Sequence, residues 1–86
     1  MKYIQLYRII EKMQYKFLGQ YIKYKRIKAG YTLNAFAIAN DIDSAILSRI
    51  ENLKQNIKLN ILEKISNGFS QTPAEFLTEF EQTKSL

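Results

Sequence analysis

Cysteine and histidine are both absent from this chain of 86 residues. Without a thiol or an imidazole, the sequence excludes disulfides, metal sites built on those ligands, and the usual nucleophile–base pairs of enzymes. Glycine occurs only three times, and no glycine precedes a Lys-Ser or Lys-Thr pair, so there is no phosphate-binding loop. We therefore expect no enzyme activity, no cofactor, no metal site and no small-molecule substrate.

Long apolar runs are missing as well. No run approaches the roughly 18–20 apolar residues that a membrane-spanning helix needs. Gln5, Arg8 and Glu11 interrupt the first residues, which is unlike a signal peptide. Together with the lack of cysteine, these features predict a cytoplasmic protein that does not associate with membranes.

The composition that is present favours one small folded domain. Apolar residues make up 47% of the chain, which is enough for a single core at this length. The formal charge of +5 is uneven: residues 1–30 hold eight basic residues and one acidic residue, while residues 69–86 are net acidic. A basic surplus attracts polyanions, with nucleic acid first and an anionic membrane second, although it also serves plain solubility.

Apolar residues recur at helical spacing, and no segment alternates at period two for long, which predicts an all-α chain. The expected helices span about 17–29, 33–40, 44–52, 57–68 and 73–80. Turn and cap residues mark their boundaries: Gly30, Thr32, Asn40-Asp41, Asp43 or Ser44, and the capping box Thr72-Pro73-Ala74-Glu75. This predicts a compact bundle of about five helices.

The same spacing predicts which side chains face the core. They are Leu18, Ile22, Arg26 and Ala29; Phe36 and Ala37; Leu47, Ile50 and Glu51; Leu59, Leu62, Ile65 and Phe69; and Phe76, Leu77 and Phe80.

The two ends of the chain are less regular. Residues 1–16 place Ile4, Tyr7 and Ile10 at helical spacing, which predicts an additional helix that packs on the domain or on a second subunit. The alternative is a leader that orders only in part. We therefore divide the chain into a helical extension at 1–16, a domain at 17–80 and a frayed tail at 81–86.

Two charged residues interrupt the apolar stripes. Arg26 continues the stripe of Leu18 and Ile22, and Glu51 follows Ile50. A charge on an inward face is costly unless it is paired. Because a guanidinium and a carboxylate can form two parallel hydrogen bonds, we predict a buried ion pair between Arg26 and Glu51. The alternative is that both are surface charges.

An ordered set of residues resembles a known family. The set is Arg26, Gly30-Tyr31-Thr32, Phe36-Ala37, Ile42, Leu47-Ser48-Arg49-Ile50-Glu51-Asn52, and the closing stretch LNILEKISNGFSQTPAEFL. Over about residues 17–77 it resembles the lambda-repressor-like helix-turn-helix domain of the Cro and XRE type. In that family the first-helix arginine and the third-helix glutamate commonly form a buried ion pair, which agrees with the prediction from the stripes.

The resemblance implies that residues 33–52 form a DNA-binding unit whose third helix, about Ser44–Asn52, enters the major groove of double-stranded DNA. The base-contacting candidates are its outward residues: Ser44, Ala45, Ile46, Ser48 and Arg49. Arg49 is the strongest, because arginine can bridge the two acceptors of guanine, although a phosphate contact or a solvated charge is the alternative. The phosphate-contacting candidates are polar residues near helix starts: Thr32, Asn34, Asn52, Lys54, Gln55 and Asn56.

Two positions depart from the family pattern. Leu33 stands where the second helix usually begins with a glutamine that touches the DNA backbone, and leucine cannot replace that amide, although Asn34 offers a substitute. Asp41 stands at a turn position that is typically glycine, and it adds a negative charge near the DNA side. These departures leave open the loss of DNA binding.

We therefore expect a sequence-specific, homodimeric transcriptional regulator of the repressor or controller type. Two copies would place their recognition helices about 34 Å apart on a roughly palindromic site. The candidate dimer surfaces are the fifth helix, with Phe76 and Phe80, and the tyrosine-rich extension at 1–16; the alternative for each is packing within the monomer. The alternative is a protein-interaction module such as an antitoxin, which binds a partner protein and has weak or no DNA binding; a toxin or a polymerase would be such a partner.

Overall fold

A computed structural model describes residues 15–84 of the chain. Within that range there are five α-helices and no strand, which confirms the predicted all-α class. The helices are α2 (Tyr15–Lys28), α3 (Leu33–Ala39), α4 (Ser44–Glu51), α5 (Leu59–Gly68) and α6 (Pro73–Lys84). The extension predicted at 1–16 lies outside the described residues except at its last two positions. No helix in the described part is long and apolar enough to cross a membrane.

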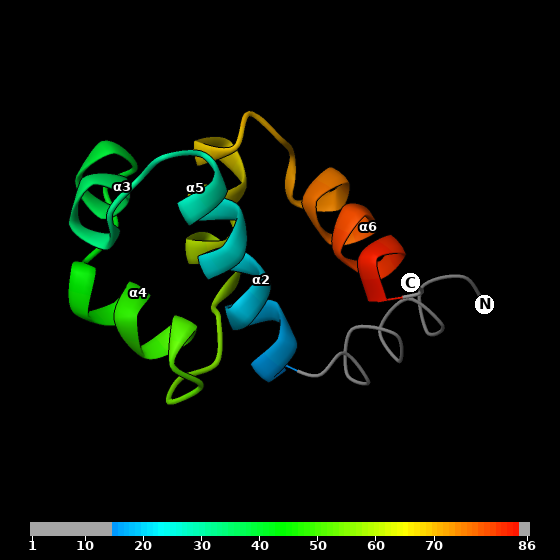
Figure 1. Cartoon of the computed structure of the whole chain (residues 1–86), viewed down its shortest axis with the longest axis horizontal. Coiled ribbons are helices and arrows are strands. Elements are labelled where there is room, and N and C mark those ends of the chain that lie inside the picture. Colours follow the sequence, from blue (N-terminus) through cyan, green and yellow to red (C-terminus); the bar gives the residue numbers. More distant parts are fainter. Residues whose placement is uncertain (1–14, 85–86) are drawn as a thin grey trace.

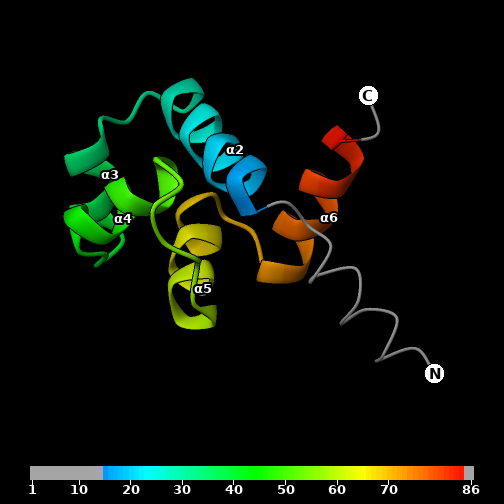
Figure 2. The ribbon, with the colours of Figure 1, turned by 90° about the horizontal axis from the view of Figure 1, so that it is seen from below.

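The helices surround one core. In Figure 1, α2 lies between the pair α3 and α4 on one side and α6 on the other. The view from below in Figure 2 separates α2 from α5, which overlap in Figure 1. All five helices, and the turn between α3 and α4 through Ile42, contribute buried apolar side chains. They are Leu18, Ile22, Phe36, Ala37, Ile42, Leu47, Ile50, Ile61, Leu62, Ile65, Phe76 and Phe80.

Side-chain caps fix three helix starts. Thr32 caps α3, and Asp43 caps α4 by accepting two backbone N–H bonds, so Ser44 is the first helical residue and not the cap. Thr72 and Glu75 form the predicted capping box, with reciprocal bonds of 2.8 and 3.1 Å. The backbone N–H of Thr72 holds the pKa of Glu75 below its ordinary value.

Two glycines are required by local geometry. Gly30 follows α2 with φ at 89°, a conformation that ends a helix and that residues with a Cβ rarely adopt. Gly19 lies where α2 crosses α4, and a Cβ added there would lie only 2.2 Å from the carbonyl oxygen of Ile50. The two helices therefore touch backbone to backbone.

Two residues predicted to face the core are exposed instead. Ala29 lies outside the core because α2 already ends at Lys28. Leu59 is 75% exposed, because α5 begins at this residue and its side chain lies at the open end of the helix. The burial of Ile61 and Ser66 was not predicted; the hydroxyl of Ser66 is satisfied by a bond within the helix.

Helix α6 continues to Lys84, so residues 81–84 are helical where the sequence predicted a frayed tail. The last turns are held against α2, because the carboxylate of Glu79 accepts hydrogen bonds from Lys25 and Tyr21. The bond from Lys25, and then the one from Tyr21, keeps the pKa of Glu79 below its ordinary value. Burial, followed by the bond to Glu79, raises the pKa of Tyr21 to about 12.

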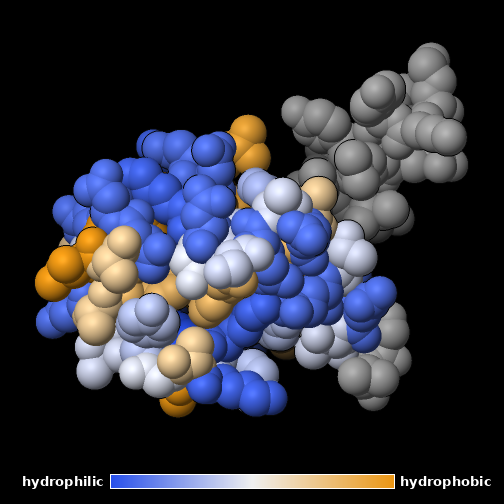
Figure 3. Space-filling view, turned by 90° about the horizontal axis from the view of Figure 1, so that it is seen from above, coloured by the Kyte–Doolittle hydropathy of each residue, from blue (hydrophilic) through white to orange (hydrophobic). Residues whose placement is uncertain are grey.

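The surface keeps several large apolar side chains. Most of the described surface on the face in Figure 3 is hydrophilic, and its apolar patches are small and separate. Three of the exposed apolar residues, Phe17, Tyr24 and Ile27, belong to α2, with exposed fractions of 44%, 57% and 56%. Scattered exposed apolar residues are normal, but three on one helix indicate a second apolar face.

Candidate nucleic-acid interface

The turn between α3 and α4 is built around Asp41. Its φ of 55° is the left-handed conformation that glycine adopts most easily and that aspartate tolerates better than most residues. Lys64 of α5 donates a hydrogen bond to the Asp41 carbonyl at 2.8 Å, and its Nζ lies 3.5 Å from the exposed carboxylate. Sequence reasoning missed Lys64, which fixes this turn and places a positive charge beside the negative one.

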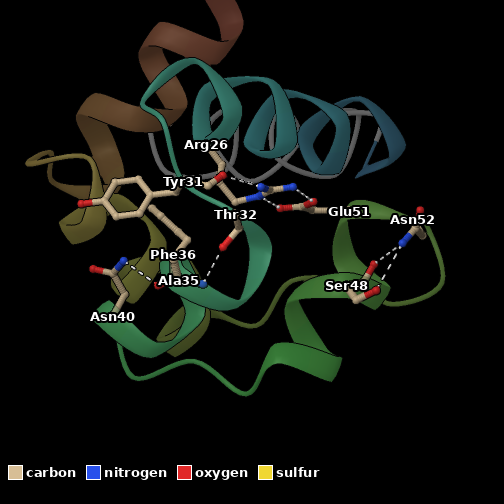
Figure 4. A network of polar contacts seen from close by, with 9 residues as sticks. All are labelled: Arg26, Tyr31, Thr32, Ala35, Phe36, Asn40, Ser48, Glu51 and Asn52. Carbon is tan, nitrogen blue, oxygen red and sulfur yellow. Dashed lines mark hydrogen bonds and ion pairs between the residues drawn. The ribbon is translucent and has the colours of Figure 1, made fainter.

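The Arg26–Glu51 ion pair joins α2 to α4. Nε and Nη2 of Arg26 donate to the two carboxylate oxygens of Glu51 at 2.8 and 2.9 Å, and the two residues are only 6% and 5% exposed (Figure 4). The remaining nitrogen, Nη1, donates to the Tyr31 carbonyl at 2.7 Å. The bond to Glu51 raises the pKa of Arg26. One guanidinium thus fixes α4 and the loop that precedes α3.

Helix α4 has two distinct faces. Leu47, Ile50 and Glu51 are buried toward the other helices. Among the predicted base-contacting residues, Ser44, Ala45 and Arg49 are exposed, and Ser48 is half-buried. Ile46 is also half-buried and packs against the core, so it offers little surface to a thymine methyl group.

Two hydrogen bonds organise the end of α4 and the loop that follows it. Nε of Arg49 donates to the side-chain oxygen of Gln55 at 2.8 Å. The Asn52 amide donates to the Ser48 carbonyl at 2.8 Å and to its hydroxyl at 3.3 Å (Figure 4). Gln55, predicted as a phosphate contact, therefore holds Arg49, a contact that the sequence did not indicate. Within residues 15–84, no hydrogen bond engages the terminal amino groups of Arg49.

The other predicted phosphate-contacting residues lie at two places. Thr32 and Asn34 are exposed at the start of α3, where the Thr32 hydroxyl is already used as the cap (Figure 4). Lys54 and Asn56 are exposed in the loop between α4 and α5. Leu33, the first departure from the family pattern, is half-buried and packs against the core, so it has a structural role.

Comparison with known proteins places the chain in a family. Sixty residues, 70% of the chain, are 37% identical to control protein C.MunI of Mycoplasma sp, and the match covers 81% of that protein. The chain belongs to the family of control protein C.MunI. No protein-family model matches it, and no solved structure matches it either.

The surface around α4 carries mainly hydrogen-bond donors. The described residues contain no group of three or more acidic, cysteine or histidine side chains that could hold a metal ion. Helix α4 carries Arg49 and the short hydroxyl side chains of Ser44 and Ser48, and the loop after it carries Lys54. These groups donate hydrogen bonds, which suits acceptors such as base edges and phosphate oxygens.

Proposed function

We propose that the chain is a transcriptional regulator of the Cro and XRE type that binds a specific double-stranded DNA site as a homodimer, with α4 in the major groove. The observation that carries the proposal is the two-faced character of α4. Its inner face is fixed by the Arg26–Glu51 pair, and its outer face, which includes Arg49, is exposed. A helix held in this way can enter a groove about 12 Å wide. Membership of the control-protein family supports a regulatory role.

Base reading is assigned chiefly to Arg49. Its bond to Gln55 restrains the guanidinium through Nε, while the terminal amino groups can donate to O6 and N7 of a guanine. Ser44 and Ser48 add short hydroxyl donors, and Ala45 adds only a methyl group. This small recognition surface favours specificity that also depends on DNA shape and on the spacing of two half-sites.

Phosphate contacts are assigned to Thr32, Asn34, Lys54 and Asn56, with Asn52 and Gln55 acting mainly inside the protein. The two family departures do not argue against this assignment. Leu33 packs on the core, and Lys64 lies beside the carboxylate of Asp41. The net charge of +5 adds an attraction for DNA that is independent of its sequence.

Selection of bound sequences from a random duplex pool tests the proposal. The expected result is a two-fold-symmetric consensus whose half-sites are centred about 34 Å apart. Binding to the selected site should weaken steeply as salt rises, because phosphate contacts release counterions. A pool that shows no enrichment, and binding without salt dependence, would contradict DNA recognition and favour a protein-interaction module instead.

A further inference from the structure

A groove lies between α2 and α6, away from the surface assigned to DNA. Its volume is about 510 Å³, and it is lined by Phe17, Gln20, Tyr21, Tyr24, Phe80 and Thr83. Tyr21 packs against Phe80 with ring centroids 5.5 Å apart, which forms the floor where the two helices meet. The two helices lie side by side in both Figure 1 and Figure 2. The lining is mainly aromatic, so the groove suits an apolar side-chain ridge.

The outer face of α2 follows a heptad spacing. Phe17, Gln20, Tyr24 and Ile27 are separated by three, four and three residues, and the three apolar members are the exposed large apolar side chains of α2. The opposite stripe of α2, with Leu18 and Ile22, is buried in the core. The outer stripe therefore leaves large apolar side chains partly exposed, and its spacing is typical of a helix that pairs with another helix.

The same spacing continues in the sequence before α2. Counting back from Phe17 by four and three residues in turn reaches an apolar residue each time: Met13, Ile10, Leu6 and Tyr3. We call residues 3–13 the front segment. The front segment and the exposed stripe of α2 thus share one repeat.

A second copy fits the groove better than the chain's own front segment does. Residues 1–18 contain no glycine and no proline, so no favoured turn residue separates Met13 from Phe17. If the helical repeat of α2 continued through the front segment, its apolar residues would extend the stripe of α2 and would not return over it. A second chain would then bring these apolar residues over the groove.

The front segment matches the groove in length and is opposite to α6 in net charge. Met13 follows Leu6 by seven positions, and Tyr24 follows Phe17 by seven positions, a rise of about 10 Å in a helix in each case. Residues 1–14 carry three basic residues and one acidic residue, whereas α6, one wall of the groove, carries three acidic residues and one basic residue. The two net charges are opposite in sign, which favours a front segment lying along α6, while the carboxylates of Glu75 and Glu79 keep their bonds within the chain.

We propose that two copies of the chain exchange their front segments reciprocally, each lying antiparallel in the groove of the other. Such an arrangement is two-fold symmetric, so both contacts form at once. This inference names the surface of the homodimer proposed above, and it depends on that dimer but not on DNA binding. The opposed pairs are Leu6 with Tyr24, Ile10 with Gln20, and Met13 with Phe17.

The mass of the full-length chain in solution, measured without DNA by analytical ultracentrifugation, tests the exchange. The wild type is expected at twice its 10.1 kDa chain mass. Ile10→Glu and Tyr24→Glu should each weaken the dimer by more than about tenfold in dissociation constant, because each places an unpaired charge in the groove. Leu59→Glu is the matched control, since Leu59 is 75% exposed on α5, and it should leave the dimer unchanged. Far-ultraviolet circular dichroism, which measures helix content, checks that every variant is folded.

A mixing experiment tests that the contact is between chains. Leu6→Lys and Tyr24→Glu proteins should each be largely monomeric, and their mixture should recover dimers, because one groove gains a lysine–glutamate pair and the other is unchanged. A monomeric wild type, dimers insensitive to Ile10→Glu and Tyr24→Glu, or no recovery on mixing would each overturn the exchange. DNA binding is assayed separately, so a stable dimer that selects no DNA sequence would contradict only the proposed function.

Discussion

Replacing Glu51 by alanine directly tests how α4 is held. The change removes both acceptors of Arg26 at a site where the two residues are 6% and 5% exposed. Nε and Nη2 of the guanidinium then lose their partners, while Nη1 keeps the Tyr31 carbonyl. A buried charge stranded in this way costs about 3–5 kcal/mol. That is a large part of the roughly 5–15 kcal/mol that holds a small domain folded.

Urea and thermal unfolding, followed by circular dichroism at neutral pH, measure the effect. For a domain of 60–100 residues, 1 kcal/mol corresponds to about 4–8 °C in Tm, so Glu51→Ala is expected to melt at least about 12 °C below the wild type. Glu63→Ala is the matched control, because Glu63 is an exposed glutamate on α5, and it should change stability by less than about 0.5 kcal/mol.

A double replacement separates the energy of the pair from the penalty of breaking it. Arg26→Met combined with Glu51→Leu strands no charge, so it should recover most of the stability lost in Glu51→Ala. If Glu51→Ala and Glu63→Ala melted at the same temperature, the ion pair would not be buried and the rigid placement of α4 would lose its basis.

Arg49→Ala should relax preference at one base pair and cost about 1–3 kcal/mol on the selected site, as measured by titrating single-base variants; uniform weakening on all sequences would indicate a backbone contact instead. Gln55→Ala should reduce the same preference to a smaller extent at an unchanged Tm, and an unaltered preference would contradict its role in orienting Arg49. Asp43→Ala removes the cap of α4 and should lower the free energy of unfolding by about 1 kcal/mol in urea, whereas no loss would show that the cap is dispensable. Because Lys25 lowers the pKa of Glu79 in the folded state, the stability from this contact is present above the ordinary glutamate pKa and is lost as pH falls through the lowered value. Glu79→Gln should therefore flatten the acid limb of a stability-against-pH curve, and an identical limb would refute the linkage.

Local rules account for the features that the sequence predicted. Helix periodicity and the caps Thr32 and Asp43 act over a few residues, so the helices could be predicted to within about two residues at most ends. The contact of Arg26 with Glu51 spans 25 residues, yet it could be inferred because both charges interrupt stripes that must face one core.

The contacts that sequence reasoning missed depend on how loops and helix ends are placed. Gln55 reaches Arg49 because the chain turns sharply after α4, where Leu53 has a φ of 66°. Lys64 of α5 donates to Asp41 in the turn between α3 and α4, and neither residue interrupts an apolar stripe. No periodicity encodes such contacts, since they require the three-dimensional course of the chain.

The absence of a side chain at Gly19 limits how this domain can vary. An added Cβ would meet the carbonyl oxygen of Ile50, which belongs to the main chain, so no change of rotamer could make room for it. Even alanine at position 19 would push the whole of α4 away from α2. It would also move Glu51, which follows Ile50, away from the guanidinium of Arg26. The position of α4 in the bundle therefore depends on the absence of a side chain at Gly19, and any larger residue there would move the helix that we propose for DNA recognition.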